Sequence, residues 1–300
     1  MNENAFEIKD GILRKYNGED KSPALPCGIT KIGAGAFKRK DIISVTLPNG
    51  LKYIGDDAFE GCHSLKSINL PDGLIEIGFQ AFKGCECLKD VLLPDSLKLI
   101  GTYAFMDCKE IKEIAIPGTD IYISEDALRG SGIKKAIIKE GKMSVPDRCF
   151  YGCMELESVS LPESIRSIGN GAFAGCTALK DIILPSKLGS IGESAFYNCK
   201  AITHIELPES LSQIGSLAFI GCSITELTVP CQVKALTKCP FGTSLKKIIL
   251  PDSICDIDID AFTGCRELED IIFSKADEFM YCFLETPFSK KQKNRSDATK

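Results

Sequence analysis

The chain has 300 residues, of which 44% are hydrophobic and 26% are charged, and its formal net charge is −5. This hydrophobic content is enough for a continuous core and argues against global disorder. The acidic balance excludes the basic footprint of a nucleic-acid-binding domain, so no nucleic-acid partner is expected. The start, MNENAFEIKDGIL, has no apolar run of signal-peptide length, and no segment approaches the roughly 20 apolar residues of a membrane span. The sequence therefore predicts a cytoplasmic protein without membrane insertion. The alternative is a secreted or surface protein whose export signal has been removed.

Residues 1–23 precede the first repeat. Two short apolar runs, around Phe6 and Ile12, are separated by Asp10-Gly11, which is a typical hairpin turn sequence. Repeat arrays need atypical ends that cover the open core. We therefore expect residues 1–23 to form a hairpin-like N-terminal cap.

Residues 24–273 repeat the pattern C-x-x-L-x-x-I-x-L-P-x-x-L-x-x-I-G-x-x-A-F-x-x-C about eleven times, in units of 21–23 residues. The phenylalanine of each unit is the clearest landmark, and leucine replaces it once. The positions are Phe37, Phe59, Phe82, Phe105, Leu128, Phe150, Phe173, Phe196, Phe219, Phe241 and Phe262. A repeat of this length predicts a solenoid, because one coil cannot bury its apolar side without neighbouring coils.

The coil at 61–85 shows how one unit is expected to fold. Leu65, Ile68 and Leu70 fit a short strand with its apolar side inward. Pro71 ends this strand because it has no N–H to donate. The Ala-Phe step later in the unit fills the core from a turn or a short helix. The expected fold class is an α/β repeat solenoid, with a parallel β-sheet on one face and turns or short helices on the other.

The signatures C-x-x-L-x-x-I-x-L-P and I-G-x-x-A-F-x-x-C resemble the BspA-like leucine-rich repeats over about residues 24–273. The stretch FEIKDGILRKYNG also resembles the end-piece before such arrays in gut-type bacterial members. The resemblance implies a curved leucine-rich-repeat solenoid, known mainly from bacterial surface proteins. It also implies a protein that binds other molecules, commonly in adhesion, without catalysis.

Two stretches depart from the repeat. In 118–150, Ser124 and Pro146 stand at the turn glycine, Leu128 replaces phenylalanine and Ser131 replaces cysteine. In 231–243 the Ile-Gly step is unrecognisable. We expect a bend or relaxed packing in these coils, and a ligand-specific loop is the alternative.

Residues 274–300 lie beyond the last repeat. The apolar and aromatic stretch at 279–288 predicts a C-terminal cap. Residues 289–300 are polar and carry five basic residues against one aspartate. A short basic terminus of this kind is expected to be a flexible, solvated tail.

Eight of the fifteen cysteines lie three residues after the phenylalanine position. They are Cys62, Cys85, Cys108, Cys153, Cys176, Cys199, Cys222 and Cys265. Stacked coils align them in one row, where free cysteine acts as a small buried apolar side chain. Neighbouring thiols in such a row point the same way, which is poor disulfide geometry. No C-x-x-C pair occurs to suggest a zinc or redox motif. We therefore expect largely free thiols.

The sequence offers no catalytic constellation. Its two histidines, His63 and His204, belong to coils six steps apart and cannot share a site. No Ser-His-Asp or Cys-His arrangement can be argued, and no phosphate-binding loop or dinucleotide fingerprint is present. We expect no enzymatic activity, no catalytic residue and no cofactor.

Recognition is left to the side chains that point outward from the strands. Leu92, Ala115, Ile137 and Ile183 are apolar at positions where a solvated face is usually polar. Exposed apolar patches often mark interaction sites, so we predict a binding surface here. The alternative is that β-branched residues are simply favoured in strands.

Four polar residues complete the predicted strand face: Asp181, His204, Glu206 and Glu226, which fall on three neighbouring coils. An imidazole among three carboxylates is a possible ligand set for a divalent metal. A solvated charged patch is the commoner reading, so no metal is assigned.

The sequence thus predicts a non-enzymatic scaffold, monomeric or weakly oligomeric, that binds a protein through its strand face. The alternative is a cell-surface adhesin for host matrix or glycan. Sugar sites favour aromatic platforms, yet the chain has no tryptophan and no aromatic residue in the two outward rows. That composition favours a protein partner over a glycan.

Overall fold

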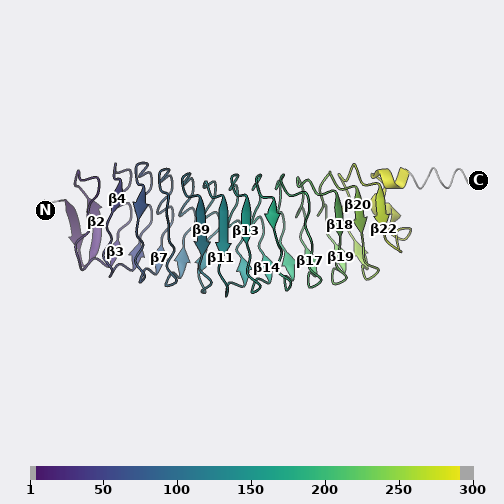
Figure 1. Cartoon of the computed structure of the whole chain (residues 1–300), viewed down its shortest axis with the longest axis horizontal. Helices are drawn as coiled ribbons and strands as arrows, with labels where there is room; N and C mark the ends of the chain where they lie inside the picture. The colour runs from purple at the N-terminus through teal and green to yellow at the C-terminus, as the bar shows by residue number, and fades with distance from the viewer. Residues whose placement is uncertain (1–4, 291–300) are drawn as a thin grey trace, which may run out of the picture.

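The computed structural model describes residues 5–290 and forms an elongated array of coils stacked side by side (Figure 1). Each regular coil contributes two short strands and one turn to three sides of the array. The N-terminal hairpin closes one end, and a short helical segment lies at the other (Figure 1). The core runs through the whole length as one apolar cluster.

The first element is a hairpin. Strands β1 (Phe6–Lys9) and β2 (Ile12–Tyr16) pair antiparallel. Asp10 and Gly11 make the turn with φ of 53° and 71°, a left-handed conformation that Gly and Asp tolerate better than most residues. Strand β2 then pairs in parallel with β3 (Lys31–Ile32). The hairpin therefore forms the first rung of the array.

The strands that carry the I-x-L-P sequence form the ladder that we call the Leu-Pro ladder. Its members are β4 (Ser44–Val45), β6 (Ser67–Ile68), β9 (Glu113–Ile116), β11 (Lys135–Ile138), β13 (Ser158–Ser160), β15 (Asp181–Ile182), β18 (Glu226–Thr228), β20 (Lys247–Ile249) and β22 (Asp270–Ile272). All of its pairings are parallel. This ladder corresponds to the sheet that the sequence predicts.

A second parallel ladder, the Ile-Gly ladder, was not predicted. It consists of β3, β5 (Tyr53–Ile54), β7 (Glu76–Ile77), β8 (Leu99–Ile100), β10 (Tyr122–Ile123), β12 (Ser144–Val145), β14 (Ser167–Ile168), β16 (Ser190–Ile191), β17 (Gln213–Ile214), β19 (Ala235–Leu236) and β21 (Asp256–Ile257). The turn position after each regular strand requires glycine, because the backbones of neighbouring coils approach each other closely there. A Cβ on Gly101 would lie 2.7 Å from the backbone of Gly78 and Phe79.

The third side consists of turns, so the predicted α/β class with short helices is wrong. Within residues 5–290 the only helical segments are the 3-10 helix η1 (Met280–Phe283) and residues 287–290. Left-handed residues explain the absence of helix in the coils, since Asp57 and Gly61 flank the Ala-Phe step with φ of 54° and 70°. A right-handed helix cannot continue through them. The N–H of Phe59 instead donates to Ala81 O of the next coil at 2.7 Å. The molecule is a β-solenoid.

The phenylalanine column is the centre of the core. The rings of Phe37 and Phe59 stack with centroids 4.9 Å apart and planes at 8°. Tyr16 of the hairpin extends the column at one end, 5.1 Å from Phe37. Phe283 of η1 extends it at the other end. Both end segments therefore place an aromatic ring against the terminal phenylalanine.

The irregular coil at 118–150 interrupts the Ile-Gly ladder and lengthens a strand pair of the Leu-Pro ladder. In regular coils the turn glycine donates its N–H to the preceding coil, as Gly101 does to Ile77 O at 2.8 Å. Pro146 has no N–H, and the Ile-Gly ladder is interrupted between β10 and β12. Lys139 stands where most coils have proline, and its N–H donates to Ile116 O at 3.0 Å. Strands β9 and β11 accordingly pair over four residues.

The irregular segment at 231–243 interrupts the Ile-Gly ladder again, between β17 and β19. Thr237 occupies the glycine position, and its hydroxyl, not its N–H, donates to Ile214 O at 3.1 Å. The Leu-Pro ladder is interrupted twice. Around Leu92 only an isolated bridge between Ser67 and Asp90 remains, and at residues 201–207 the strand expected around His204 is absent. The predicted basic tail lies mostly in 291–300, outside the described residues.

Candidate functional site

The Leu-Pro ladder presents two rows of side chains outward. Leu92 and Ile183 are 82% and 86% exposed, and Ile137 is 37% exposed. Ala115 is half-buried and lies beside Ile137 in the parallel register. The aliphatic residues that the sequence selects therefore do lie on the outer face. Ser160 interrupts the row between Ile137 and Ile183.

Charged side chains flank the apolar row. Lys135 lies directly beside Glu113 in the register of β11 and β9, and both are exposed. Lys139 Nζ lies 3.1 Å from the carboxylate of Asp95, which belongs to a coil two steps earlier. The face thus combines isolated aliphatic residues with charged ones, among which Lys139 and Asp95 form an ion pair.

The described side chains of the predicted histidine cluster are exposed to solvent. His204 Nε2 lies 3.5 Å from Glu206 Oε1, and the two side chains are 74% and 91% exposed. Glu226 lines the same cavity of about 660 Å³, which opens where the ladder is interrupted. The side chain of Asp181 lies outside the described part of the structure. Among the side chains that are described, no three His, Cys, Asp or Glu residues are grouped to hold a metal ion.

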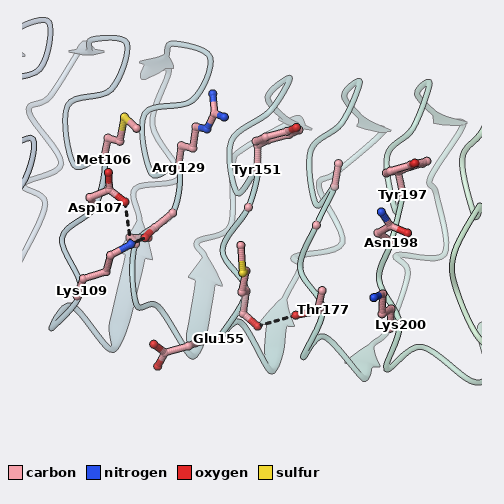
Figure 2. Close-up of a pocket in the computed structure, with 16 residues that line it drawn as sticks. Met106, Asp107, Lys109, Arg129, Tyr151, Glu155, Thr177, Tyr197, Asn198 and Lys200 are labelled. Carbon is pink, nitrogen blue, oxygen red and sulfur yellow. Dashed lines mark hydrogen bonds and ion pairs between the residues drawn. The ribbon is translucent and has the colours of Figure 1, made fainter.

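A larger cavity of about 730 Å³, which we call the turn-edge groove, crosses five coils where the turn side meets the Leu-Pro ladder. Figure 2 shows one wall formed by the residues after the phenylalanine column, including Tyr151 and Tyr197. The opposite wall includes Lys109, Thr177 and Lys200 (Figure 2). Glycines such as Gly152 and the buried Ala174 keep the space between the walls open.

A buried carboxylate positions the side chains of the wall that contains Tyr151 and Tyr197. Asp126 is only 4% exposed and accepts three hydrogen bonds from Arg148 at 3.0 to 3.2 Å. These contacts raise the pKa of Arg148 above its usual value. The Arg148 guanidinium lies 4.2 Å from the centre of the Tyr151 ring, and that of Arg129 lies 5.0 Å from it. Tyr151 is thereby fixed at the groove by two cation–π contacts.

The opposite wall, which contains Lys109 and Lys200, carries both paired and unpaired charges. Lys109 Nζ bonds Asp107 at 2.7 Å and the carbonyl of Gly130 at 2.6 Å. Glu155 is 3.3 Å from Lys112. Lys200 is exposed at the far end of the groove, and no ion pair to it is found among the described side chains.

Sequence reasoning missed this groove because it followed only the strand rows. The signal lay in the column one residue after the phenylalanine position, where Ala174 falls between Tyr151 and Tyr197. The aromatic residues sought in the outward strand rows lie on the turn edge instead.

The cysteine row belongs to the core and not to a reactive site. All fifteen cysteines are free, and the eight of the row are buried. Burial raises the pKa of the thiol to about 11 at Cys153 and to about 12 at Cys62. A thiol held protonated in this way is a poor nucleophile and a poor metal ligand.

The two ladders, the phenylalanine column and the buried cysteine row define a leucine-rich-repeat solenoid. The BspA type leucine-rich repeat region matches the chain in six copies over residues 30–153, 132–244 and 237–290. The chain therefore belongs to the BspA-type leucine-rich repeat family, as the resemblance predicts. Proteins of this class are generally non-enzymatic scaffolds, and no enzyme family was found.

Solved structures of bacterial leucine-rich repeat proteins share the fold. A protein from Bacteroides ovatus is 27% identical, with a TM-score of 0.64 over 95% of this chain and 78% of that chain. A leucine-rich repeat protein from T. pallidum is 28% identical, with a TM-score of 0.56 over 60% and 91%. The pneumococcal vaccine antigen PcpA, at 21% identity and a TM-score of 0.58 over 90% and 78%, shows the fold alone. No curated protein matched the chain.

The fold supports a general binding role, because repeat arrays of this type present extended surfaces to other molecules. In residues 5–290, no helix has the length and apolar character needed to cross a membrane.

Proposed function

We propose that the chain is a non-enzymatic scaffold that binds a protein partner through the outward rows of the Leu-Pro ladder. The observation that carries this proposal is the exposure of Leu92 and Ile183, at 82% and 86%. Neither side chain contributes to the core of the solenoid. Burial of each against a partner would contribute about 1.5–3 kcal/mol.

The surroundings of the row suit a protein interface. Interfaces of this kind combine an apolar centre with a polar rim. Ile137 and Ala115 extend the apolar row, while Lys135 and Glu113 supply charges beside it. The polar residues His204, Glu206, Glu226 and Asp181 are proposed as the rim of this interface.

A surface adhesin is the second proposal. BspA-like repeat proteins are often surface-exposed or secreted, which is compatible with this role. The outward rows of the Leu-Pro ladder still contain no aromatic platform for a sugar. A proteinaceous target therefore fits this face better than a glycan. The cytoplasmic location and the monomeric or weakly oligomeric state likewise remain proposals.

The test is affinity capture from the source cells with the full chain and two double variants. Leu92→Glu with Ile183→Glu places charges on the apolar row, whereas Thr46→Glu with Thr228→Glu adds the same charges at exposed polar positions of the row that lie outside the stretch from Leu92 to Ile183. The first variant should lose the partners that the unmodified chain and the second variant retain. Retention of every partner by the first variant would contradict the proposal. Fractionation of the source cells separates the scaffold from the adhesin, because an adhesin must be outside the cell.

A further inference from the structure

We propose that the turn-edge groove is a second binding site, distinct from the outward rows. Its ligand is an extended, acidic segment of a protein chain that carries one aromatic side chain between its carboxylates. The inference rests on the proposed function only in taking a protein as the partner. It uses different residues and a different side of the solenoid.

Uncompensated positive charge is the first observation. Arg148 and Arg129 share one carboxylate, with Asp126 Oδ2 at 3.0 Å from Arg148 and 3.9 Å from Arg129. Arg148 makes the short contacts, so the charge of Arg129 is only weakly balanced. Lys200 has no ion pair among the described side chains.

The remaining charges of the groove are paired. Lys109 is bound to Asp107 at 2.7 Å. Glu155 is 3.3 Å from Lys112, which also lies 3.9 Å from Glu110 outside the groove. The groove therefore has surplus positive charge at Arg129, in its second coil, and at Lys200, in its last, in a chain whose net charge is −5. A carboxylate makes stronger, charge-assisted hydrogen bonds with such cations than a neutral group does.

The middle of the groove is apolar and aromatic. Tyr151 and the 39% exposed Tyr197 line one side, and the 66% exposed Met154 lines the other. Ala174 between the two tyrosines adds no bulk. Aromatic side chains and methionine sulfur both favour contact with a further ring. These residues account for the aromatic side chain in the proposed ligand.

The spacing sets the length of the ligand. Arg129 and Lys200 lie three coils apart, which is roughly 15 Å at the usual strand spacing. An extended chain rises about 3.3 Å per residue, so two carboxylates about four or five residues apart reach both cations. A cavity of about 730 Å³ over five coils accommodates a segment of that length.

The experiment is fluorescence polarisation of the full chain with a labelled EGFSGE peptide. Three control peptides change one property each: QGFSGQ removes the charge, KGFSGK reverses it, and EGASGE removes the ring. The acidic aromatic peptide should bind about tenfold more tightly than the neutral one, and added salt should weaken it. Absence of binding, or equal binding of the neutral or basic peptide, overturns the proposal.

Variants of the protein test whether the peptide binds in the turn-edge groove. Lys200→Gln should weaken the binding of both acidic peptides, EGFSGE and EGASGE, about fivefold or more. Tyr197→Ala should weaken the binding of EGFSGE by a similar factor and leave that of EGASGE unchanged, because only EGFSGE has an aromatic ring. Lys187→Gln and Tyr122→Ala change the same residue types at other exposed positions and should leave binding unchanged. Equal losses in these controls would overturn the assignment.

Two further measurements separate this proposal from others. Leu92→Glu with Ile183→Glu should still bind the peptide, whatever those changes do to the partner of the strand face. A sulfated oligosaccharide also carries negative charge but has no aromatic ring. If it binds more tightly than EGFSGE, and Lys200→Gln abolishes that binding, the groove is a glycan site and the proposal is wrong.

Discussion

The thiol of Cys176 donates a hydrogen bond to the backbone carbonyl of Phe150 in the preceding coil, with 3.1 Å between Sγ and O. The same contact recurs along the row, for example from Cys199 to Phe173 O at 3.1 Å. Each thiol thus fills a small core position and links its coil to the one before it. This double role explains why cysteine recurs at a position where alanine would also be buried.

Replacement of Cys176 tests that role. Cys176→Ala removes the donor and leaves a small cavity, so the free energy of unfolding should fall by about 1–2 kcal/mol. Cys176→Ser should cost less, because the natural Ser131 finds a partner in Leu128 O of its own coil at 2.7 Å. Urea unfolding followed by circular dichroism measures the order. The exposed Cys27 provides the control, since Cys27→Ala should change little; a serine variant less stable than the alanine variant would contradict the argument.

The buried thiols also predict unfolding at alkaline pH. Burial raises the pKa to about 11 at Cys153 and to about 12 at Cys62, Cys222 and Cys265, from an ordinary value of 9.0. Above pH 9 the unfolded chain releases these protons while the folded chain keeps them. The contribution to stability is therefore complete below about pH 9 and is lost as the pH rises toward 11–12, by up to about 1.4 kcal/mol per pH unit for each thiol.

A pH series of urea unfolding between pH 8 and 11 measures this loss. Replacing Cys62 and Cys222 with alanine should make the decline in stability with pH shallower, since two titrating groups are gone. Replacing the exposed Cys231 and Cys255 should leave the slope unchanged. An identical slope in all three proteins would assign the alkaline effect to groups other than the buried thiols.

The sequence was most informative where the repeat fixes an inward side chain. The phenylalanine landmarks and the cysteine row are all buried, because a constant period leaves each coil the same set of apolar residues. The outward position of Leu92 and Ile183 was predicted from strand alternation, and both side chains are exposed although neither residue lies within a strand of the structure. These features depend on one coil and its period, which a single sequence contains.

Features that depend on neighbouring coils were missed. The Ile-Gly strands are two residues long, too short for an alternating pattern to reveal them. Tyr103 and Leu217 adopt φ of 59°, although their residue types give no sign of a left-handed turn. The turn-edge groove likewise joins residues from five coils. Tertiary packing decides all three features.

The turn glycine is predicted to be essential for the close approach of coils. A Cβ on Gly101 would lie 2.7 Å from Phe79 N and from the carbonyl carbon of Gly78, and neither backbone atom can move freely. Gly101→Ala should therefore destabilise the chain by about 1–3 kcal/mol. Gly50→Ala is the control, because nothing lies within 4 Å of a Cβ at that position. Thermal unfolding of the two variants should differ, and equal melting temperatures would refute the steric argument.

Lys139 is predicted to hold the longest strand pair together through its backbone. Its N–H donates to Ile116 O at 3.0 Å, a bond that the proline of most other coils cannot make. Lys139→Pro should remove this bond, shorten β11 and lower stability by about 1 kcal/mol, without a clash because other coils accept proline here. Lys139→Ala keeps the N–H and loses only the exposed ion pair to Asp95, which is worth less than about 1 kcal/mol.

Hydrogen exchange separates these two effects of changing Lys139. In the proline variant, amides of β11 next to the lost bond should exchange faster, because the end of the strand is no longer held to β9. In the alanine variant they should keep the exchange rates of the unmodified chain. If both variants exchange alike, the side chain and not the backbone stabilises this coil, and the extra strand length would have another cause.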